Sequence, residues 1–149
     1  MKNGKFFLVI SMLLYVASLP MSCYSAQGQF GFTSGWELLL FGWLDLITGV
    51  PIWLANPAIL LAWLMFALRK TRLASVLATL AFCLSLTFLF FTESPMPSFE
   101  APPVGRITGY GPGYCLWVAS MGTMVIGTMV KWVNEKSEVS TEEDGSRSS

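Results

Sequence analysis

The chain has 149 residues, of which 54% are hydrophobic and 12% charged, and its formal net charge is zero. A soluble domain carries about 25% charged residues, and seven of the eighteen charged residues here lie after position 133. This composition excludes a disordered chain, a nucleic-acid-binding protein driven by positive charge and an ordinary cytosolic enzyme. It predicts a single transmembrane domain over residues 1–133, with the lipid bilayer as a partner.

Four apolar stretches predict the fold. A helix needs about 20 mostly apolar residues to cross the ~30 Å hydrocarbon layer, because no water there satisfies free backbone groups. The stretches that meet this requirement are about 6–21, 50–68, 73–91 and 114–132. The sequence therefore predicts an all-α membrane protein, a bundle of four transmembrane helices.

The start of the second stretch has two interpretations. Asn56 followed by Pro57 fits an N-cap with proline at the first helical position, which gives a short helix. Alternatively the helix begins at Pro51 and Pro57 kinks it, which neighbouring helices allow in a membrane. We favour the longer helix.

Lysine and arginine set the expected orientation, because cytoplasmic loops carry an excess of them. Four spans place seven basic residues on one side, which is then the cytoplasm: Lys2, Lys5, Arg69, Lys70, Arg72, Lys131 and Lys136. Arg106 is the lone basic residue on the outer side. Both termini are therefore predicted to be cytoplasmic.

The first stretch also resembles a secretory signal, with two lysines, an apolar core and small residues at about 22–26. It contains no A-x-A site, and the residues before Cys23 do not fit a lipoprotein signal. Cleavage within residues 1–25 stays open. It would leave three spans and would change the side of no loop.

The segments outside the four stretches differ in character. Ser34-Gly35-Trp36-Glu37 matches a capping box, so we expect a helix over about 35–48 that is too short to cross and lies in the outer interface or dips into it. Residues 92–113 hold five prolines and four glycines and are predicted to form an irregular outer loop. The polar, acidic segment 134–149 is predicted to be a disordered cytoplasmic tail.

Few outer residues are candidates for function: Glu37, Asp45, Arg106 and Tyr110. Asp45 is the only acid inside a long apolar run, where a deeply buried charge indicates function, although we favour a position facing the outer headgroups. Arg106 could pair with Asp45, Glu37 or Glu100. Tyr110 lies in Thr108-Gly109-Tyr110-Gly111, which turn formation explains better than a potassium filter does.

Groups for catalysis are scarce in the sequence. The chain lacks histidine, which is the commonest general base and metal ligand. The three cysteines do not have the spacing of a zinc or iron–sulfur site. We therefore expect no catalytic residues, no metal and no cofactor.

Two of the cysteines fall at similar depth. Cys23 and Cys115 lie at the predicted outer ends of the first and fourth spans. A disulfide between them is one option in an oxidising compartment, but similar depth does not ensure the ~5.5 Å that must separate their α-carbons. Cys83, in the middle of the third span, is interpreted as a small buried hydrophobic residue.

Small residues recur at helical spacing on two spans. On the third span they are Ala74, Ala78, Ala81 and Ser85, and on the fourth they are Ala119, Thr123 and Gly127. Such faces let helix backbones approach closely in lipid. They predict helix packing, either within the bundle or between subunits.

The order of several motifs resembles that of a known group of proteins. The motifs are Ser18-Leu19-Pro20, Gly42-Trp43-Leu44, Trp53-Leu54-Ala55-Asn56-Pro57 and Gly109-Tyr110-Gly111-Pro112-Gly113-Tyr114, which runs into Leu116-Trp117-Val118-Ala119-Ser120. Over about residues 6–132 the chain resembles uncharacterised small four-span inner-membrane proteins of Gram-negative bacteria. The resemblance implies a multi-pass protein of the bacterial inner membrane and implies no chemistry.

These observations give three hypotheses for function. The first is a non-enzymatic accessory subunit or partner-binding protein, which associates with a membrane protein or with copies of itself. The alternative is a small oligomeric transporter or channel, which needs a polar path through the bundle. The third is a membrane enzyme that acts on lipid.

Overall fold

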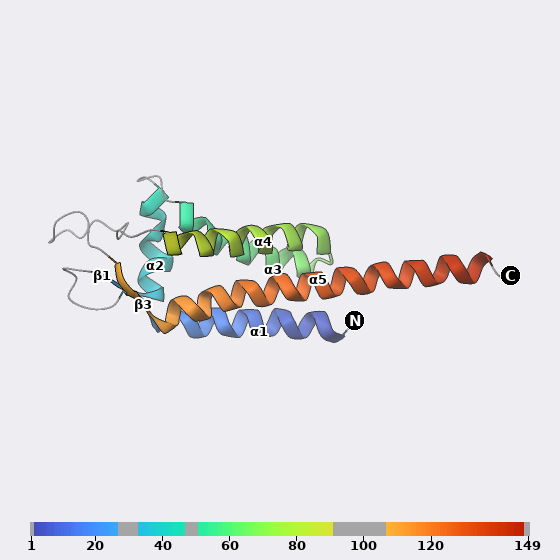
Figure 1. The fold of residues 1–149 in the computed structure, drawn as a ribbon, viewed down its shortest axis with the longest axis horizontal. Helices are drawn as coiled ribbons and strands as arrows, with labels where there is room; N and C mark the ends of the chain where they lie inside the picture. Colours follow the sequence, from blue (N-terminus) through green and yellow to red (C-terminus); the bar gives the residue numbers. More distant parts are fainter. Residues whose placement is uncertain (1, 27–32, 47–50, 91–106, 148–149) are drawn as a thin grey trace.

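The computed structural model describes residues 2–26, 33–46, 51–90 and 107–147. Within these ranges the chain is mostly helical, as predicted. Its long helices run side by side (Figure 1): α1 (Lys2–Ser18), α3 (Ala55–Ala67), α4 (Thr71–Thr87) and α5 (Pro112–Arg147). α5 contacts α1 and α4, and α4 also contacts α3.

The apolar helices coincide with the four predicted stretches. Two helical segments, Thr71–Phe90 and Pro112–Glu135, are long and apolar enough to cross a membrane. The first of them is α4 extended by the 3₁₀ turn η3 (Phe88–Phe90). The other two apolar helices, Gly4–Ser18 and Pro51–Ala67, are shorter.

Helical backbone in the second stretch begins at Pro51, but its first turn is the 3₁₀ helix η2 (Pro51–Leu54), which leads into α3. Pro57 is the third residue of α3, where the helix needs no N–H donor, so the proline does not interrupt it. Leu54 occupies the N-cap position. Asn56 is therefore not a cap, and its side chain is buried.

The predicted capping box is confirmed at the start of α2 (Gly35–Phe41). The Glu37 backbone N–H donates to Ser34 Oγ (3.4 Å), and the Ser34 N–H donates to Glu37 Oε2 (3.0 Å). The helix is shorter than the predicted 35–48, because the chain continues from Gly42 as the 3₁₀ helix η1 (Gly42–Leu46). Figure 1 shows α2 lying across the ends of the long helices.

A small antiparallel sheet lies at the same end of the bundle, and the all-α prediction lacked it (Figure 1). Its order is β2–β1–β3, with β1 at Ser22–Ala26, β2 at Thr33–Ser34 and β3 at Ile107–Tyr110. Tyr24 pairs with Tyr110, and Ala26 pairs with Ile107. The glycine and proline content had indicated that residues 107–110 are irregular, but pairing with β1 gives one side of this segment backbone hydrogen-bond partners.

Two glycines let α5 begin directly against β1. A Cβ on Gly111 would overlap the carbonyl oxygen of Ser22, and one on Gly113 would lie 2.8 Å from that of Met21. The Gly111 N–H donates to the Cys23 carbonyl at 2.7 Å. These glycines are therefore required for close approach of two backbones.

The helix α5 extends to Arg147, over most of the segment predicted to be a disordered tail. Adding residues to an existing helix is far easier than nucleating one, and glutamate and lysine in this segment are good helix formers. The extension starts from an anchored position, because Glu135 accepts a hydrogen bond from Thr71 Oγ1 (3.1 Å) and lies 3.8 Å from Lys131 Nζ.

Burial in the bundle differs from that of a soluble protein. Large apolar side chains on the outward helix surfaces are exposed, among them Phe6, Leu13, Val16, Leu64, Val76 and Met129. Several buried positions are polar instead, namely Ser11, Ser18, Asn56, Thr71, Ser85, Ser120 and Thr128. The described part of the bundle thus presents an apolar exterior and encloses polar groups.

The predicted small-residue faces of α4 and α5 differ in how far they are buried. On α4 the whole face, Ala74, Ala78, Ala81 and Ser85, is buried within the bundle. On α5 Gly127 is buried, and a Cβ there would lie 2.5 Å from the Cβ of Phe7 on α1. Ala119 is exposed and Thr123 is half-buried, because residues at four-residue steps drift around a helix of 3.6 residues per turn.

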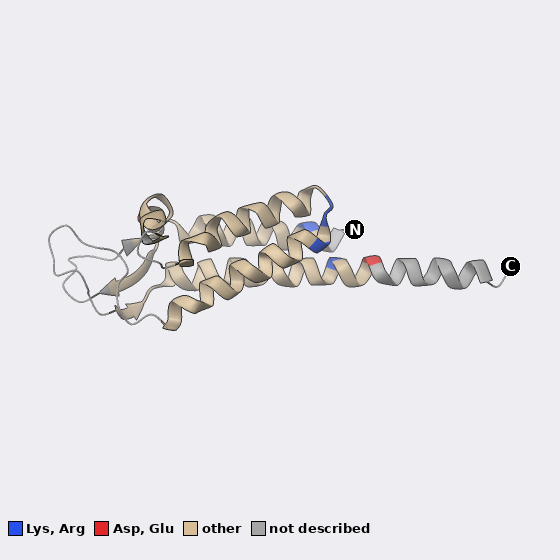
Figure 2. Cartoon of the chain, turned by 90° about the horizontal axis from the view of Figure 1, so that it is seen from above, with Lys and Arg blue, Asp and Glu red and all other residues tan. Residues whose placement is uncertain are grey.

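The described basic residues gather at the end of the bundle opposite the sheet, as Figure 2 shows. They lie near the start of α1, in the turn between α3 and α4, and on α5 at Lys131. Within that turn Arg69 has a φ of 61°, which makes it the one non-glycine residue of the described chain in the left-handed region. Lys131 Nζ also lies 4.5 Å from the ring centre of Phe66.

Replacing Gly111 with alanine should destabilise the β1–β3–α5 junction, because the new methyl group overlaps the Ser22 carbonyl. We expect a loss on the order of 2 kcal/mol or more in the free energy of unfolding, measured in detergent by circular dichroism. Gly109→Ala is the matched control, since its Cβ would meet only Ser25 Oγ at 3.6 Å. Equal stability of the two variants would contradict the packing described.

Candidate functional site

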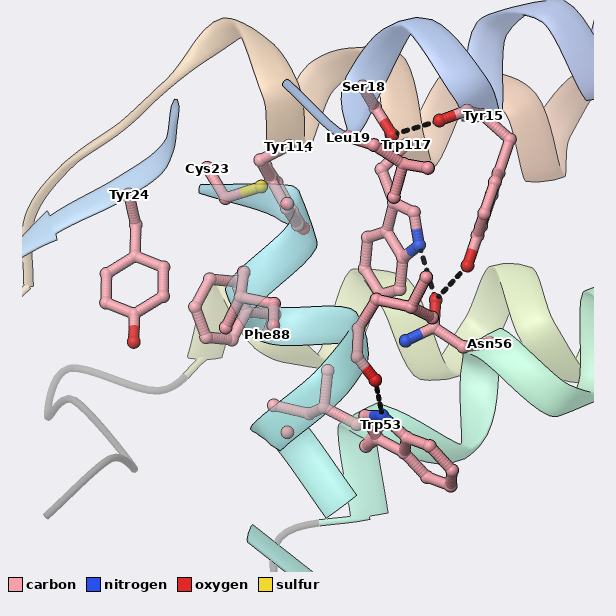
Figure 3. A pocket seen from close by; sticks show the side chains of 15 residues that line it. Tyr15, Ser18, Leu19, Cys23, Tyr24, Trp53, Asn56, Phe88, Tyr114 and Trp117 are labelled. Atoms are coloured by element: carbon pink, nitrogen blue, oxygen red, sulfur yellow. Dashed lines mark hydrogen bonds between the residues drawn. The ribbon is translucent and has the colours of Figure 1, made fainter. Parts of the chain in front are cut away.

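A cavity of about 70 Å³ lies between α2 and the ends of the long helices. Side chains from α1, β1, α2, η2, α3, η3 and α5 line it, so its walls combine segments that lie far apart in the sequence (Figure 3). The walls are mainly apolar and aromatic, including Leu38, Ile52, Phe88 and Trp117. Among the described residues, no charged side chain lines it.

The amide of Asn56 is the central polar group of the cavity wall. Its Oδ1 accepts a hydrogen bond from the Tyr15 hydroxyl (3.0 Å) and another from Trp117 Nε1 (2.9 Å). The asparagine thereby links α3 to both α1 and α5. Figure 3 shows the amide nitrogen on the other side of the group, facing the cavity.

An aromatic cluster forms the wall next to the sheet. The Phe88 ring lies 5.5 Å from the ring of Tyr24, 5.6 Å from that of Tyr110 and 5.4 Å from that of Tyr114. Two hydroxyls hold this cluster against the end of α4, since Tyr114 donates to the Ser85 carbonyl (2.8 Å) and Tyr110 to the Phe88 carbonyl (3.3 Å). The wall is therefore fixed by ring packing and by hydrogen bonds.

A second set of hydrogen-bonded polar side chains lies deeper in the bundle. Trp63 Nε1 donates to Ser11 Oγ (3.0 Å), and Ser11 Oγ donates to the Ser120 carbonyl (2.8 Å). The rings of Trp63 and Tyr15 pack edge to face at 5.4 Å. Like the Asn56 group, this one joins α1, α3 and α5.

Of the four predicted outer residues, the structure describes the side chains of Glu37 and Tyr110, which belong to different parts of the fold. Glu37 is exposed and caps α2, whereas Tyr110 belongs to β3 and the aromatic cluster. The backbone of Asp45 lies in η1, but its side chain is outside the described residues. Arg106 also lies outside them.

The disulfide considered between Cys23 and Cys115 is not formed, and both are free thiols. Gly113 faces Cys23, since a Cβ there would lie 3.1 Å from its Sγ. Cys115 is two residues further along the helix, about 200° around its axis, and so points away. Burial raises the pKa of the Cys23 thiol from 9.0 to about 11. Cys83, expected to be buried, is exposed like Cys115.

Sequence reasoning missed Asn56, Tyr15 and Trp117 as the polar centre of the fold. The available signal was an amide inside an apolar stretch, which indicates an internal partner. The following proline suggested a helix cap instead. Which hydroxyl or indole meets Asn56 depends on how distant helices pack, and one sequence does not contain that information.

The comparisons with known proteins found no matching family model, no matching curated protein and no matching solved structure. Among the described residues, no group of three or more His, Cys, Asp or Glu side chains could hold a metal ion. The site is thus defined by its geometry, which is an apolar cavity with one buried amide. Such a site can hold a mostly apolar group and orient it through a single hydrogen bond.

Replacing Asn56 with leucine should destabilise the bundle by about 1–3 kcal/mol, because the Tyr15 and Trp117 donors both lose their acceptor. Tyr15→Phe should have a smaller effect, since Asn56 keeps its bond to Trp117. Unfolding in mixed detergent micelles measures both. Thr87→Val is the control, because that exposed hydroxyl donates only to the Leu84 carbonyl of its own helix. An Asn56→Leu variant as stable as this control would contradict the role given to the amide.

Proposed function

We propose that this chain is a four-span protein of the bacterial inner membrane, with both termini in the cytoplasm, and that it acts by association. The apolar exterior and the enclosed polar side chains support a lipid environment. At about 1.5 Å per residue, a 17-residue helix such as α1 or α4 is about 25 Å long. That length approaches the ~30 Å of a hydrocarbon layer.

The charge distribution supports the orientation. The described basic side chains lie at one end of the bundle (Figure 2), and cytoplasmic ends of membrane helices carry such an excess. α2 lies across the opposite end and exposes Trp36, Leu40 and Phe41. A short helix with apolar residues on its outward side suits the outer interface.

Association is favoured over transport or catalysis by one observation: the buried serine and threonine hydroxyl groups of the described residues form hydrogen bonds within the chain. Ser85 and Thr128 donate to carbonyls of their own helices, at 2.7 and 2.8 Å. Ser11 and Ser120 contact each other. The described helix surfaces expose many large apolar side chains. These features suit an accessory subunit or a partner-binding protein.

The orientation predicts two accessibility results. A fluorescent reporter fused after Ser149 should be active in the cytoplasm, and a membrane-impermeant maleimide applied from outside should label Cys115, which is exposed near the start of α5. Cys23 should stay unlabelled from pH 7 to 9, because its thiolate forms only near its pKa of about 11. Cys83→Ala removes the third thiol. A reporter active only outside the cytoplasm would refute the topology.

Association predicts that the full chain leaves its own membrane in a complex. Extraction in a mild detergent followed by size measurement should give a species larger than one chain with its micelle, either a homo-oligomer or a complex with another membrane protein. Treatment with a harsh detergent supplies the monomer reference. A strictly monomeric protein without any partner would contradict this function.

A further inference from the structure

We propose that the cavity between α2 and the bundle binds a phospholipid by the ester group and adjoining carbons of one acyl chain, with the Asn56 amide nitrogen donating to the ester carbonyl. This inference rests on the membrane location proposed above. It adds a ligand class and a recognition contact to the cavity.

The orientation of the amide follows from its partners. An indole N–H can only donate, so the Asn56 atom that faces Trp117 must be the oxygen. The nitrogen then points to the cavity, as Figure 3 shows. Asn56 is only 7% exposed, and no described residue accepts a hydrogen bond from its nitrogen. A buried donor without a partner is unfavourable, and a bound acceptor would remove that penalty.

The lining defines the chemistry of the ligand. Apolar walls without a described charged residue favour a neutral, mostly apolar group with one acceptor. A free fatty acid would bring a carboxylate with no cation beside it, which is unfavourable in such surroundings. A peptide group would bring an N–H donor as well as a carbonyl. An ester needs only the donor that Asn56 supplies.

The size of the cavity favours a chain over a ring. At about 70 Å³ the cavity is roughly half of the ~150 Å³ that holds a benzene molecule in an engineered protein cavity. A short section of acyl chain with its ester fits this space better than the head group of a quinone does.

The position of the cavity brings such esters within reach. α2 forms one wall through Leu38 and Leu39, and its outward side exposes Trp36, Leu40 and Phe41. In the proposed arrangement this helix lies at the boundary between headgroups and acyl chains. Ester carbonyls of the outer leaflet occupy that same depth.

Native mass spectrometry of the delipidated full chain in detergent tests the proposal, with two phosphatidylcholines of equal chain length as probes. One carries ester links, and the other carries ether links without carbonyls. We expect one bound lipid per chain and a preference of about three- to tenfold for the diester, which corresponds to one net hydrogen bond.

Paired variants on α2 locate the site. Leu38→Trp should fill the cavity and reduce diester binding at least tenfold, whereas Leu40→Trp, on the exposed side of the same helix, should bind as the natural chain does. Asn56→Leu should abolish the preference for the diester over the diether. Thermal melting checks that each variant is folded. If Asn56→Leu does not fold, the comparison of Leu38→Trp with Leu40→Trp tests the proposal by itself.

Three results would overturn the inference: equal binding of diester and diether, undiminished binding by folded Leu38→Trp, or tighter binding of an isoprenoid quinone. Each of them leaves the proposed membrane function in place, because location and association are measured separately by the reporter and by extraction. A reporter that places the C-terminus outside would instead refute the topology, whatever the lipid binding.

Discussion

The shared hydrogen-bond acceptor of Asn56 is the interaction on which the arrangement of the bundle depends. Its single oxygen receives the Tyr15 hydroxyl of α1 and the Trp117 indole of α5. Without Asn56 the buried Tyr15 hydroxyl and the half-buried Trp117 indole would both lose this acceptor. The packing of α1, α3 and α5 thus depends on Asn56 Oδ1. The same geometry orients the amide nitrogen of Asn56 toward the cavity.

The sheet and the aromatic cluster at the same end of the bundle depend on that arrangement. Cys23 and Tyr24 follow α1 closely in the sequence. They pack with Phe88, just after the end of α4, and with Tyr114, in the first turn of α5. A shift of α1 along α5 would therefore disturb the sheet and the aromatic wall together. This explains how a chain of modest size builds a defined cavity at one end of a bundle.

Local signals in the sequence predicted local structure well. The hydropathy of four stretches indicated the helices, and the pattern Ser34 to Glu37 indicated a capping box, because both ends of that motif lie within one turn. The sheet was missed, since β1 pairs with a strand more than eighty residues away. Asn56 was misinterpreted because the adjacent Pro57 gave a local explanation, whereas its actual partners are 41 and 61 positions distant.

The left-handed backbone of Arg69 has a consequence for how the protein is made. Glycine would fit that conformation more easily, by up to about 1 kcal/mol, yet it would remove a positive charge from the hairpin between α3 and α4. In the proposed topology that charge resists translocation while the chain is being inserted, before any tertiary contact exists. Membrane insertion therefore favours arginine at position 69, whereas the stability of the folded protein favours glycine.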